Sequence, residues 1–251
     1  MKSTFPKLLR EKSLKWQDQR IAIRQKDFGI WHTVTWKEFY EYAKSFSLGL
    51  KSLGFERGEN VCIIGHNEPE WVYAELAIQS LGGAAIGIYQ DSNPPEIKYI
   101  IEKSDAVYVV AEDQEQVDKL LEIAGDLPLL RKIIYWDAKG MRNYDEPILL
   151  NFHDVQELGK THEQSHAGIF ESEIDAGKPD DTAIILTTSG TTSVPKLAMI
   201  SHRNMLTMGE NLLLKQDITE ASDEFVSFLP LPWVGEQMMC LTGSLLVGLT
   251  I

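Results

Sequence analysis

The chain has 251 residues, 43% hydrophobic and 24% charged, which is the balance of a globular protein able to bury a substantial core. Aspartate and glutamate number 37 against 24 lysines and arginines, so the formal net charge of −13 disfavours nucleic acid as a partner, and no basic patch offsets it. The two cysteines, Cys62 and Cys240, have no Cys or His at metal-ligand spacing. Two cysteines allow at most one disulfide bridge, and a reducing cytoplasm is the expected location.

Short apolar runs alternate with amphipathic runs through residue 137. The stretch 30–54 predicts a strand followed by a helix, and Asn67 is placed to cap a later helix that has Pro69 in its first turn. The repeated alternation predicts an α/β fold, with a mostly parallel sheet flanked by helices on both faces. The other predicted elements here are strands at 60–65, 84–89, 106–112 and 132–137, and helices at 67–82, 94–104 and 113–125.

The alternation fades in the polar stretch 138–181. We interpret it as a connection between two sheet subdomains, 1–180 and 181–251, of one domain spanning 1–251. Beyond it, Ser201 is expected to cap a helix. The uncharged stretch 238–251 is shorter than the roughly 20 residues of a membrane span, so we expect a buried helix that leads into a strand. The remaining predicted elements are strands at 182–187, 196–200 and 223–231, and helices at 201–216 and 234–248.

A hydroxyl-rich run, TTSGTTSVPK, separates two of these apolar strands. Backbone N–H groups around a glycine can curl into an anion site, and hydroxyl groups add donors. Gly190 permits the turn and Lys196 supplies positive charge, so the run predicts a phosphate-binding loop. The alternative is a turn whose hydroxyls bond their own backbone. The P-loop, Rossmann and serine-elbow glycine patterns are absent. The candidate ligands are Thr188, Ser189, Gly190, Thr191, Thr192, Ser193 and Lys196.

The longer run TTSGTTSVPKLAMISHRN closely resembles the phosphate-binding signature of the adenylate-forming enzymes, which include acyl- and aryl-CoA synthetases, peptide-synthetase adenylation domains and firefly luciferase. Residues 58–113 resemble an early part of the same family. Residues 227–239 resemble its acyl-pocket motif in the form found in bacterial long-chain acyl-CoA synthetases. The matching positions of the signature are Thr188, Ser189, Gly190, Thr191, Thr192, Pro195, Lys196, Ser201, His202 and Asn204.

This resemblance implies the incomplete N-terminal domain of the adenylate-forming fold. It also implies that the complete protein uses ATP, Mg²⁺ and coenzyme A to convert a fatty acid into an acyl-adenylate and then a thioester. The loop 188–196 would hold the β- and γ-phosphates. Trp233, Gly235 and Glu236 would line an acyl pocket, and ordinary core packing stays an equal alternative for them. Catalytic residues are expected beyond residue 251, because the family's aromatic-Gly-x-Thr-Glu motif, ribose-binding Asp and catalytic Lys are not found in this chain.

Two positions depart from the signature, since Ser193 and Leu197 stand where glycine is usual. The side chain of Leu197 is expected to crowd the loop or to shift the backbone of Lys196. A structural role is at least as well supported for His202 as one in orienting the loop, and helix capping is preferred for His66. The chain is expected to be a fragment or the product of a split gene. The rival hypothesis is therefore a non-catalytic nucleotide-binding or assembly module that needs a C-terminal partner chain. A peripheral membrane contact is left open, and no metal site on the protein itself is predicted.

Overall fold

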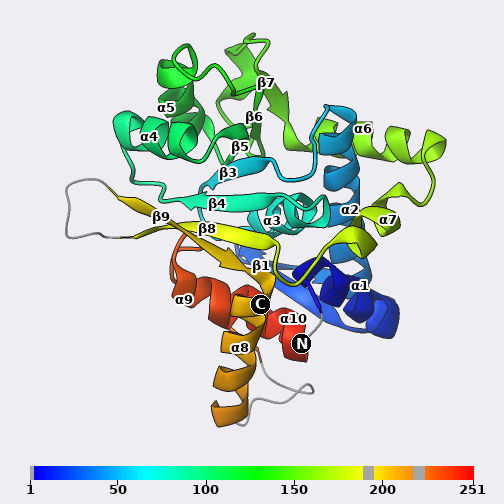
Figure 1. Ribbon diagram of the computed structural model, residues 1–251. Helices are drawn as coiled ribbons and strands as arrows, with labels where there is room; N and C mark the ends of the chain where they lie inside the picture. The colour runs from blue at the N-terminus through cyan, green and yellow to red at the C-terminus, as the bar shows by residue number, and fades with distance from the viewer. Residues whose placement is uncertain (1–2, 189–194, 217–223) are drawn as a thin grey trace.

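The computed structural model describes residues 3–188, 195–216 and 224–251. Within them, a seven-stranded sheet in the order β7-β6-β5-β3-β4-β8-β9 runs through the molecule (Figure 1). Neighbouring strands are parallel except β9, which is antiparallel to β8. The predicted α/β fold is therefore confirmed. The strands are β3 Asn60–Ile64, β4 Ala84–Ile88, β5 Ala106–Ala111, β6 Lys132–Tyr135, β7 Leu149–Asn151, β8 Thr182–Thr188 and β9 Lys196–Ser201.

The central strands are buried on both faces. Side chains alternate across a strand, so Val61 and Ile63 pack in one hydrophobic cluster while Cys62 and Ile64 pack in another on the opposite face. All four side chains are fully buried. Two-sided burial requires the near-continuous apolar sequence from which this strand was predicted.

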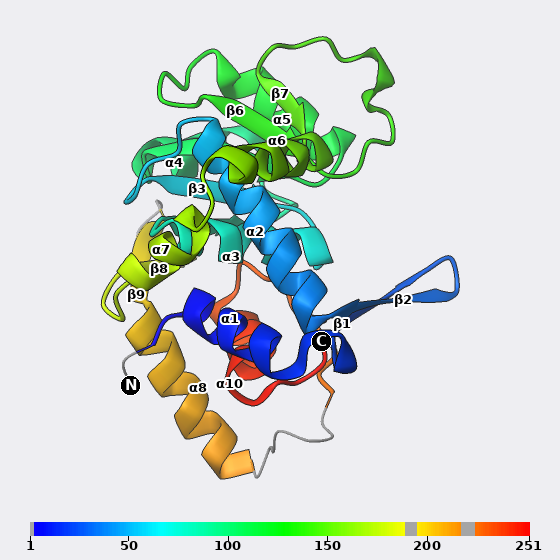
Figure 2. The same ribbon diagram turned by 90° about the vertical axis from the view of Figure 1, so that its right-hand side faces the viewer.

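Helices cover both faces of the sheet (Figures 1 and 2). The cluster around Cys62 is closed by α4 and α5, and the larger cluster on the other face contains residues of α1, α2, α3, α6 and α7. Helices α2 and α6 approach so closely that a Cβ on Gly49 would lie 2.0 Å from the carbonyl oxygen of Val155. The helices are α1 Phe5–Trp16, α2 Trp36–Ser52, α3 Pro69–Ser80, α4 Pro94–Lys103, α5 Gln114–Ala124, α6 Phe152–Ser165 and α7 Ile169–Ala176.

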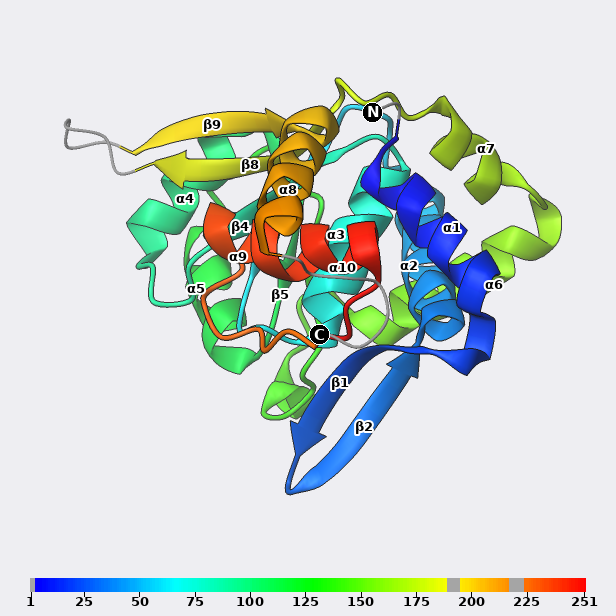
Figure 3. The ribbon, with the colours of Figure 1, turned by 90° about the horizontal axis from the view of Figure 1, so that it is seen from below.

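A separate hairpin, β1 Ile21–Asp27 and β2 Ile30–Thr35, projects from the body (Figure 3). Its turn holds Phe28 at φ 45° and Gly29 at φ 83°, the left-handed backbone typical of two-residue hairpin loops. Thr35 then caps α2 in a reciprocal capping box with Glu38. The strand and helix predicted over 30–54 are thus confirmed.

The last part of the chain is mainly helical. Ser201 Oγ accepts a hydrogen bond from the Asn204 N–H at 3.2 Å, which confirms the predicted cap of α8, His202–Gln216. The buried helix expected near the end is also present. It consists of α9 Val234–Gln237, a π-helical turn Met238–Thr242 and α10 Gly243–Val247. Within the described ranges, every helix is too short or too polar to cross a lipid bilayer.

Two local predictions are wrong, and in the first of them a distant segment competes for the residue involved. The N-cap of α3 is Glu68, without a side-chain cap, while the Asn67 amide is used elsewhere. The Asn67 Nδ2 donates to the Leu229 carbonyl at 2.7 Å, and its Oδ1 accepts from the Leu231 N–H at 3.1 Å. Of the predicted strand 223–231, the described residues contain a single isolated bridge, at Glu224.

The stretch 138–181 does not separate two sheets, contrary to our expectation. It contains β7, α6 and α7. Ala85 of β4 pairs with Ile184 of β8, so strands from both sides of the stretch belong to one sheet. The sheet therefore gives no reason to divide the chain near residue 180. The predicted limits of the whole domain, 1–251, stay a prediction.

Candidate functional site

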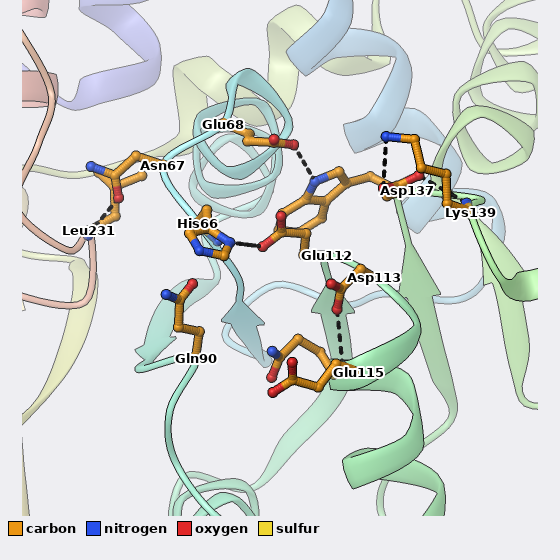
Figure 4. A network of polar contacts seen from close by, with 12 residues as sticks. His66, Asn67, Glu68, Gln90, Glu112, Asp113, Glu115, Asp137, Lys139 and Leu231 are labelled. Carbon is orange, nitrogen blue, oxygen red and sulfur yellow. Dashed lines mark hydrogen bonds and ion pairs between the residues drawn. The ribbon is translucent and has the colours of Figure 1, made fainter. Parts of the chain in front are cut away.

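The parallel strands direct their following loops to one edge of the sheet, where α/β proteins commonly bind ligands. Figure 4 shows the part of this edge that follows β3, β5 and β6. Gly65 permits close packing there, because a Cβ on it would lie 2.6 Å from both the Cβ of Glu112 and a ring carbon of Trp136. The loops after these three strands therefore lie directly against one another.

Acidic side chains dominate this packed part of the edge. The backbone N–H and the Nδ1 of His66 lie 2.6 and 2.7 Å from Oε2 of Glu112, so His66 contacts a carboxylate and does not cap a helix. The indole N–H of Trp136 donates to Glu68 at 2.8 Å, and burial raises the pKa of the Glu68 carboxyl. A triphosphate would be repelled here. Among the described residues, no group of three or more His, Cys, Asp or Glu side chains is arranged to hold a metal ion.

The hydroxyl-rich loop connects β8 to β9 at the same edge of the sheet. Thr188 ends β8, Lys196 begins β9, and the two residues pair in the ladder. Thr188 Oγ1 donates to the Lys196 carbonyl at 3.4 Å, and the Tyr99 hydroxyl donates to the Pro195 carbonyl at 3.0 Å. The ends of the loop are therefore fixed. The other predicted phosphate ligands, Ser189, Gly190, Thr191, Thr192 and Ser193, lie outside the described residues.

The described end of the loop carries positive charge beside a concave surface. Lys196 is exposed, and together with Lys103 it lines a hollow of about 550 Å³ between α4 and β9. Leu197 pairs with Thr187 and packs against the hydrophobic cluster beneath α4. In the described residues the Leu197 side chain is thus directed at the core, and Lys196 keeps its position at the start of the strand.

The predicted acyl-pocket residues lie at the start of α9. Trp233 is 46% exposed, and Gly235 packs so tightly beneath it that a Cβ would lie 2.1 Å from the indole ring. Glu236 is fully buried and accepts a hydrogen bond from the Ser227 hydroxyl at 2.6 Å. Burial raises the pKa of the Glu236 carboxyl. The three residues are brought together, and their role in holding an acyl chain stays a prediction.

His202 has a structural position. It is 2% exposed, its Nδ1 accepts a hydrogen bond from the Phe5 N–H at 3.3 Å, and its ring meets the Phe5 ring edge-on at 5.3 Å. Burial lowers the pKa of His202 to about 4, so the imidazole is neutral near pH 7. The residue ties α8 to α1 and does not face the loop as a charged group.

Sequence reasoning missed a buried polar network behind this site. Glu75, which is 1% exposed, accepts hydrogen bonds from Gln79 Nε2 at 3.0 Å and from Gln237 Nε2 at 2.8 Å. Burial raises the pKa of Glu75 to about 7. A cavity of about 10 Å³ beside it, bounded also by Trp71 and Leu231, has room for about one water molecule. The available signal was the pair Glu75 and Gln79, four residues apart in a helix whose residues 71–78 are otherwise apolar or aromatic.

Comparison with known proteins adds to this geometry. Residues 9–251 match the family model described as AMP-binding enzyme. A long-chain-fatty-acid–CoA ligase of Xenopus laevis is 31% identical over 240 residues, which are 94% of this chain and 32% of that protein. One of Rattus norvegicus is 29% identical over 221 residues, 87% of this chain and 30% of the relative. The chain spans about a third of the length of these curated relatives.

Solved structures show the same fold. A long-chain-fatty-acid–CoA ligase from Archaeoglobus fulgidus aligns with a TM-score of 0.81 and 17% identity, covering 100% of this chain and 46% of that one. An anthranilate CoA ligase solved with anthranoyl-AMP aligns with a TM-score of 0.79 and 21% identity, covering 99% of this chain and 44% of that one. At these identities the likeness concerns the fold alone.

Proposed function

This chain belongs to the AMP-binding enzyme family, and from that premise we propose that it is the nucleotide-binding N-terminal part of an ATP-dependent ligase that joins a long-chain fatty acid to coenzyme A. The observation that carries the proposal is the position of Thr188 and Lys196. They pair at the carboxyl end of β8, fix both ends of the hydroxyl-rich loop, and leave the lysine ammonium exposed beside a hollow. The names of the curated relatives support the choice of a long-chain fatty acid.

In this proposal the chain binds and orients the triphosphate. Hydroxyl and backbone N–H donors between Thr188 and Lys196 hold the β- and γ-phosphates, and the Lys196 ammonium offsets part of their charge. Mg²⁺ bound together with ATP would neutralise part of the remaining phosphate charge. The fatty-acid carboxylate then attacks the α-phosphate and pyrophosphate leaves. Coenzyme A displaces AMP to give the thioester.

A calorimetric titration tests the nucleotide site directly. Mg²⁺–ATP is titrated into the wild-type chain and into Lys196→Ala, with Lys160→Ala, an exposed lysine on α6, as the matched control. Loss of one charge-assisted contact is expected to weaken binding about tenfold or more in Lys196→Ala and to leave the control unchanged. Equal affinity of all three proteins, or no binding by the wild type, would remove the proposed role of the loop.

The reaction needs a separate assay. Exchange of pyrophosphate into ATP is measured in a protein that spans the full length of the relatives, with and without a long-chain fatty acid. Exchange that depends on the fatty acid is expected. Absence of this exchange would refute the ligase reaction. The conclusion of the nucleotide titration would be unaffected.

The second candidate is a non-catalytic nucleotide-binding or assembly module. It is favoured by Leu197, which stands where the family signature usually has glycine. Binding of Mg²⁺–ATP only after a partner polypeptide is added would favour this candidate. Tight binding by the chain alone would count against an assembly module that does not bind nucleotide by itself.

A further inference from the structure

The end of the β1–β2 hairpin projects away from the rest of the molecule (Figures 2 and 3). Residues 30–33 of β2 are all exposed, although neighbouring side chains of a strand point to opposite faces, so neither face of the hairpin covers a core here. A two-stranded ribbon without a covered face is only marginally stable in water. Apolar side chains at this end of the hairpin therefore do not contribute to the core of the protein.

The tip nevertheless carries three large apolar side chains. Phe28 is 87% exposed, Ile30 63% and Trp31 61%, and the three fall within four consecutive positions. Single exposed apolar residues are common on protein surfaces, but a contiguous group on a projecting element indicates a contact surface. Phe28 also lies at φ 45°, in the left-handed region that suits glycine or asparagine and is unfavourable for a bulky residue. The aromatic ring is thus kept at the tip at a conformational cost.

Ammonium groups flank the two aromatic rings. Lys26 is paired with Trp31 in the ladder, and its Nζ lies 5.5 Å from the centre of the Trp31 ring. The Nζ of Lys139, from the loop after β6, lies 5.9 Å from the centre of the Phe28 ring. Residues 24–32 contain two cations against one carboxylate, in a chain whose net charge is −13. An anionic surface would repel the chain as a whole and attract this locally basic tip.

We propose that the hairpin tip binds a lipid bilayer containing anionic lipids, with Phe28, Ile30 and Trp31 inserted at the level of the headgroups. Aromatic rings are favoured at this depth, and lysine side chains can bury their apolar stems there while the ammonium groups contact headgroup phosphates.

A lipid surface fits this tip better than a protein partner does. A tip exposed on both faces offers little area to the single flat surface of a protein, and a stable protein interface buries about 1,200–2,000 Å². Lipid headgroups, in contrast, can surround both faces at once. The inference concerns an interaction surface and does not depend on the phosphate-binding loop, so failure of the test below would leave the nucleotide titration unaffected.

The test is sedimentation of the purified 251-residue chain with vesicles of phosphatidylcholine and about one third phosphatidylserine. Phe28→Asn replaces the ring with a residue that tolerates the left-handed backbone, and Leu129→Asn, at a leucine that is 53% exposed, is the matched control. We expect saturable binding by wild type and by the control, and binding weakened about tenfold in Phe28→Asn. The melting temperature of Phe28→Asn is expected to equal or exceed that of wild type, whereas a merely structural role of Phe28 would lower it.

Fluorescence provides a second measurement that locates the contact. Lipids with brominated acyl chains are expected to quench the tryptophan fluorescence of wild type. Trp31→Phe keeps an aromatic ring at the tip, so we expect it to bind the vesicles like wild type and to show much less quenching.

Four outcomes would overturn the proposal. They are no saturable binding by wild type, equal binding by Phe28→Asn and wild type, a lower melting temperature of Phe28→Asn, and unchanged quenching in Trp31→Phe. Self-association without lipid that Phe28→Asn abolishes would overturn it as well, because the tip would then contact a second copy of the chain.

Discussion

Glu75 makes the stability of this protein depend on pH in a way that can be worked out from its surroundings. The carboxyl group is buried in α3, and burial raises its pKa to about 7, above the ordinary value of 4.5. The folded state therefore retains a proton that the unfolded chain releases. The stabilising contribution is fully present below pH 4.5 and is lost as the pH rises through 7. The difference of about 2.5 units corresponds to about 3 kcal/mol in the free energy of unfolding.

Glu75→Gln removes this titration while keeping the size of the side chain. The new amide N–H₂ needs an acceptor, and Oε1 of Gln79 and of Gln237 both lack a partner among the described residues. Rotation of either amide by half a turn supplies one. We therefore expect the variant to match wild type within about 0.5 kcal/mol near pH 4.5 and to exceed its free energy of unfolding by about 3 kcal/mol at pH 8.

The measurement is urea unfolding followed by tryptophan fluorescence at pH 4.5, 6 and 8. Comparing the two proteins at each pH cancels the contribution of every other titrating group. Glu115→Gln serves as the control, since Glu115 is an exposed residue of α5 that pairs with Lys119 at 2.8 Å. A difference between Glu75→Gln and wild type that stays constant from pH 4.5 to 8 would refute the reasoning.

Two further predictions concern packing on the larger hydrophobic face. Because burial lowers the pKa of His202 to about 4, the wild-type protein loses stability as the pH falls from about 6.5 towards 4. His202→Asn is less stable than wild type at pH 7, and we expect this difference in the free energy of unfolding, measured in urea, to shrink by about 2 kcal/mol at pH 4.5. A difference that stays constant between the two pH values would contradict this prediction. Gly49→Ala should lower the free energy of unfolding by about 2 kcal/mol or more, because its Cβ would meet the Val155 carbonyl oxygen, whereas Gly125→Ala, with open space around it, should change thermal unfolding little. Equal effects of the two alanines would show that close helix contact is not what Gly49 provides.

Most of the fold could be predicted from the sequence because its strands are buried on both faces. The run at Asn60–Ile64 is apolar without interruption apart from its first residue, and only a central strand or a buried helix tolerates that composition. Local caps were also predictable where the partner lies three residues away, as for Ser201 and Asn204. Asn67 has the same local signal, but its amide binds residues more than 160 positions along the chain. A rule based on neighbouring residues cannot register that competition.

Part of the candidate site was also predictable, because its residues are neighbours in the sequence. The phosphate-loop residues are contiguous, so their order alone suggested the chemistry, and Thr188 and Lys196 lie where a loop at the sheet edge requires them. The contact between Glu75 and Gln237 joins positions 162 residues apart and depends on how α9 packs against α3. The acidic contacts of His66 with Glu112 likewise come from loops after two different strands. Spacing along the chain carries no information about such contacts.

The pairing of β4 with β8 has a consequence for how the protein is made. Ala85 and Ile184 are neighbours in the finished sheet, yet roughly 100 residues lie between them. At a translation rate of about 5–20 residues per second, the ribosome needs about 5–20 s to deliver β8 after β4 has emerged. During that time one side of β4 lacks its neighbouring strand. The nascent chain is therefore expected to depend on chaperones until residue 188 has left the exit tunnel of the ribosome.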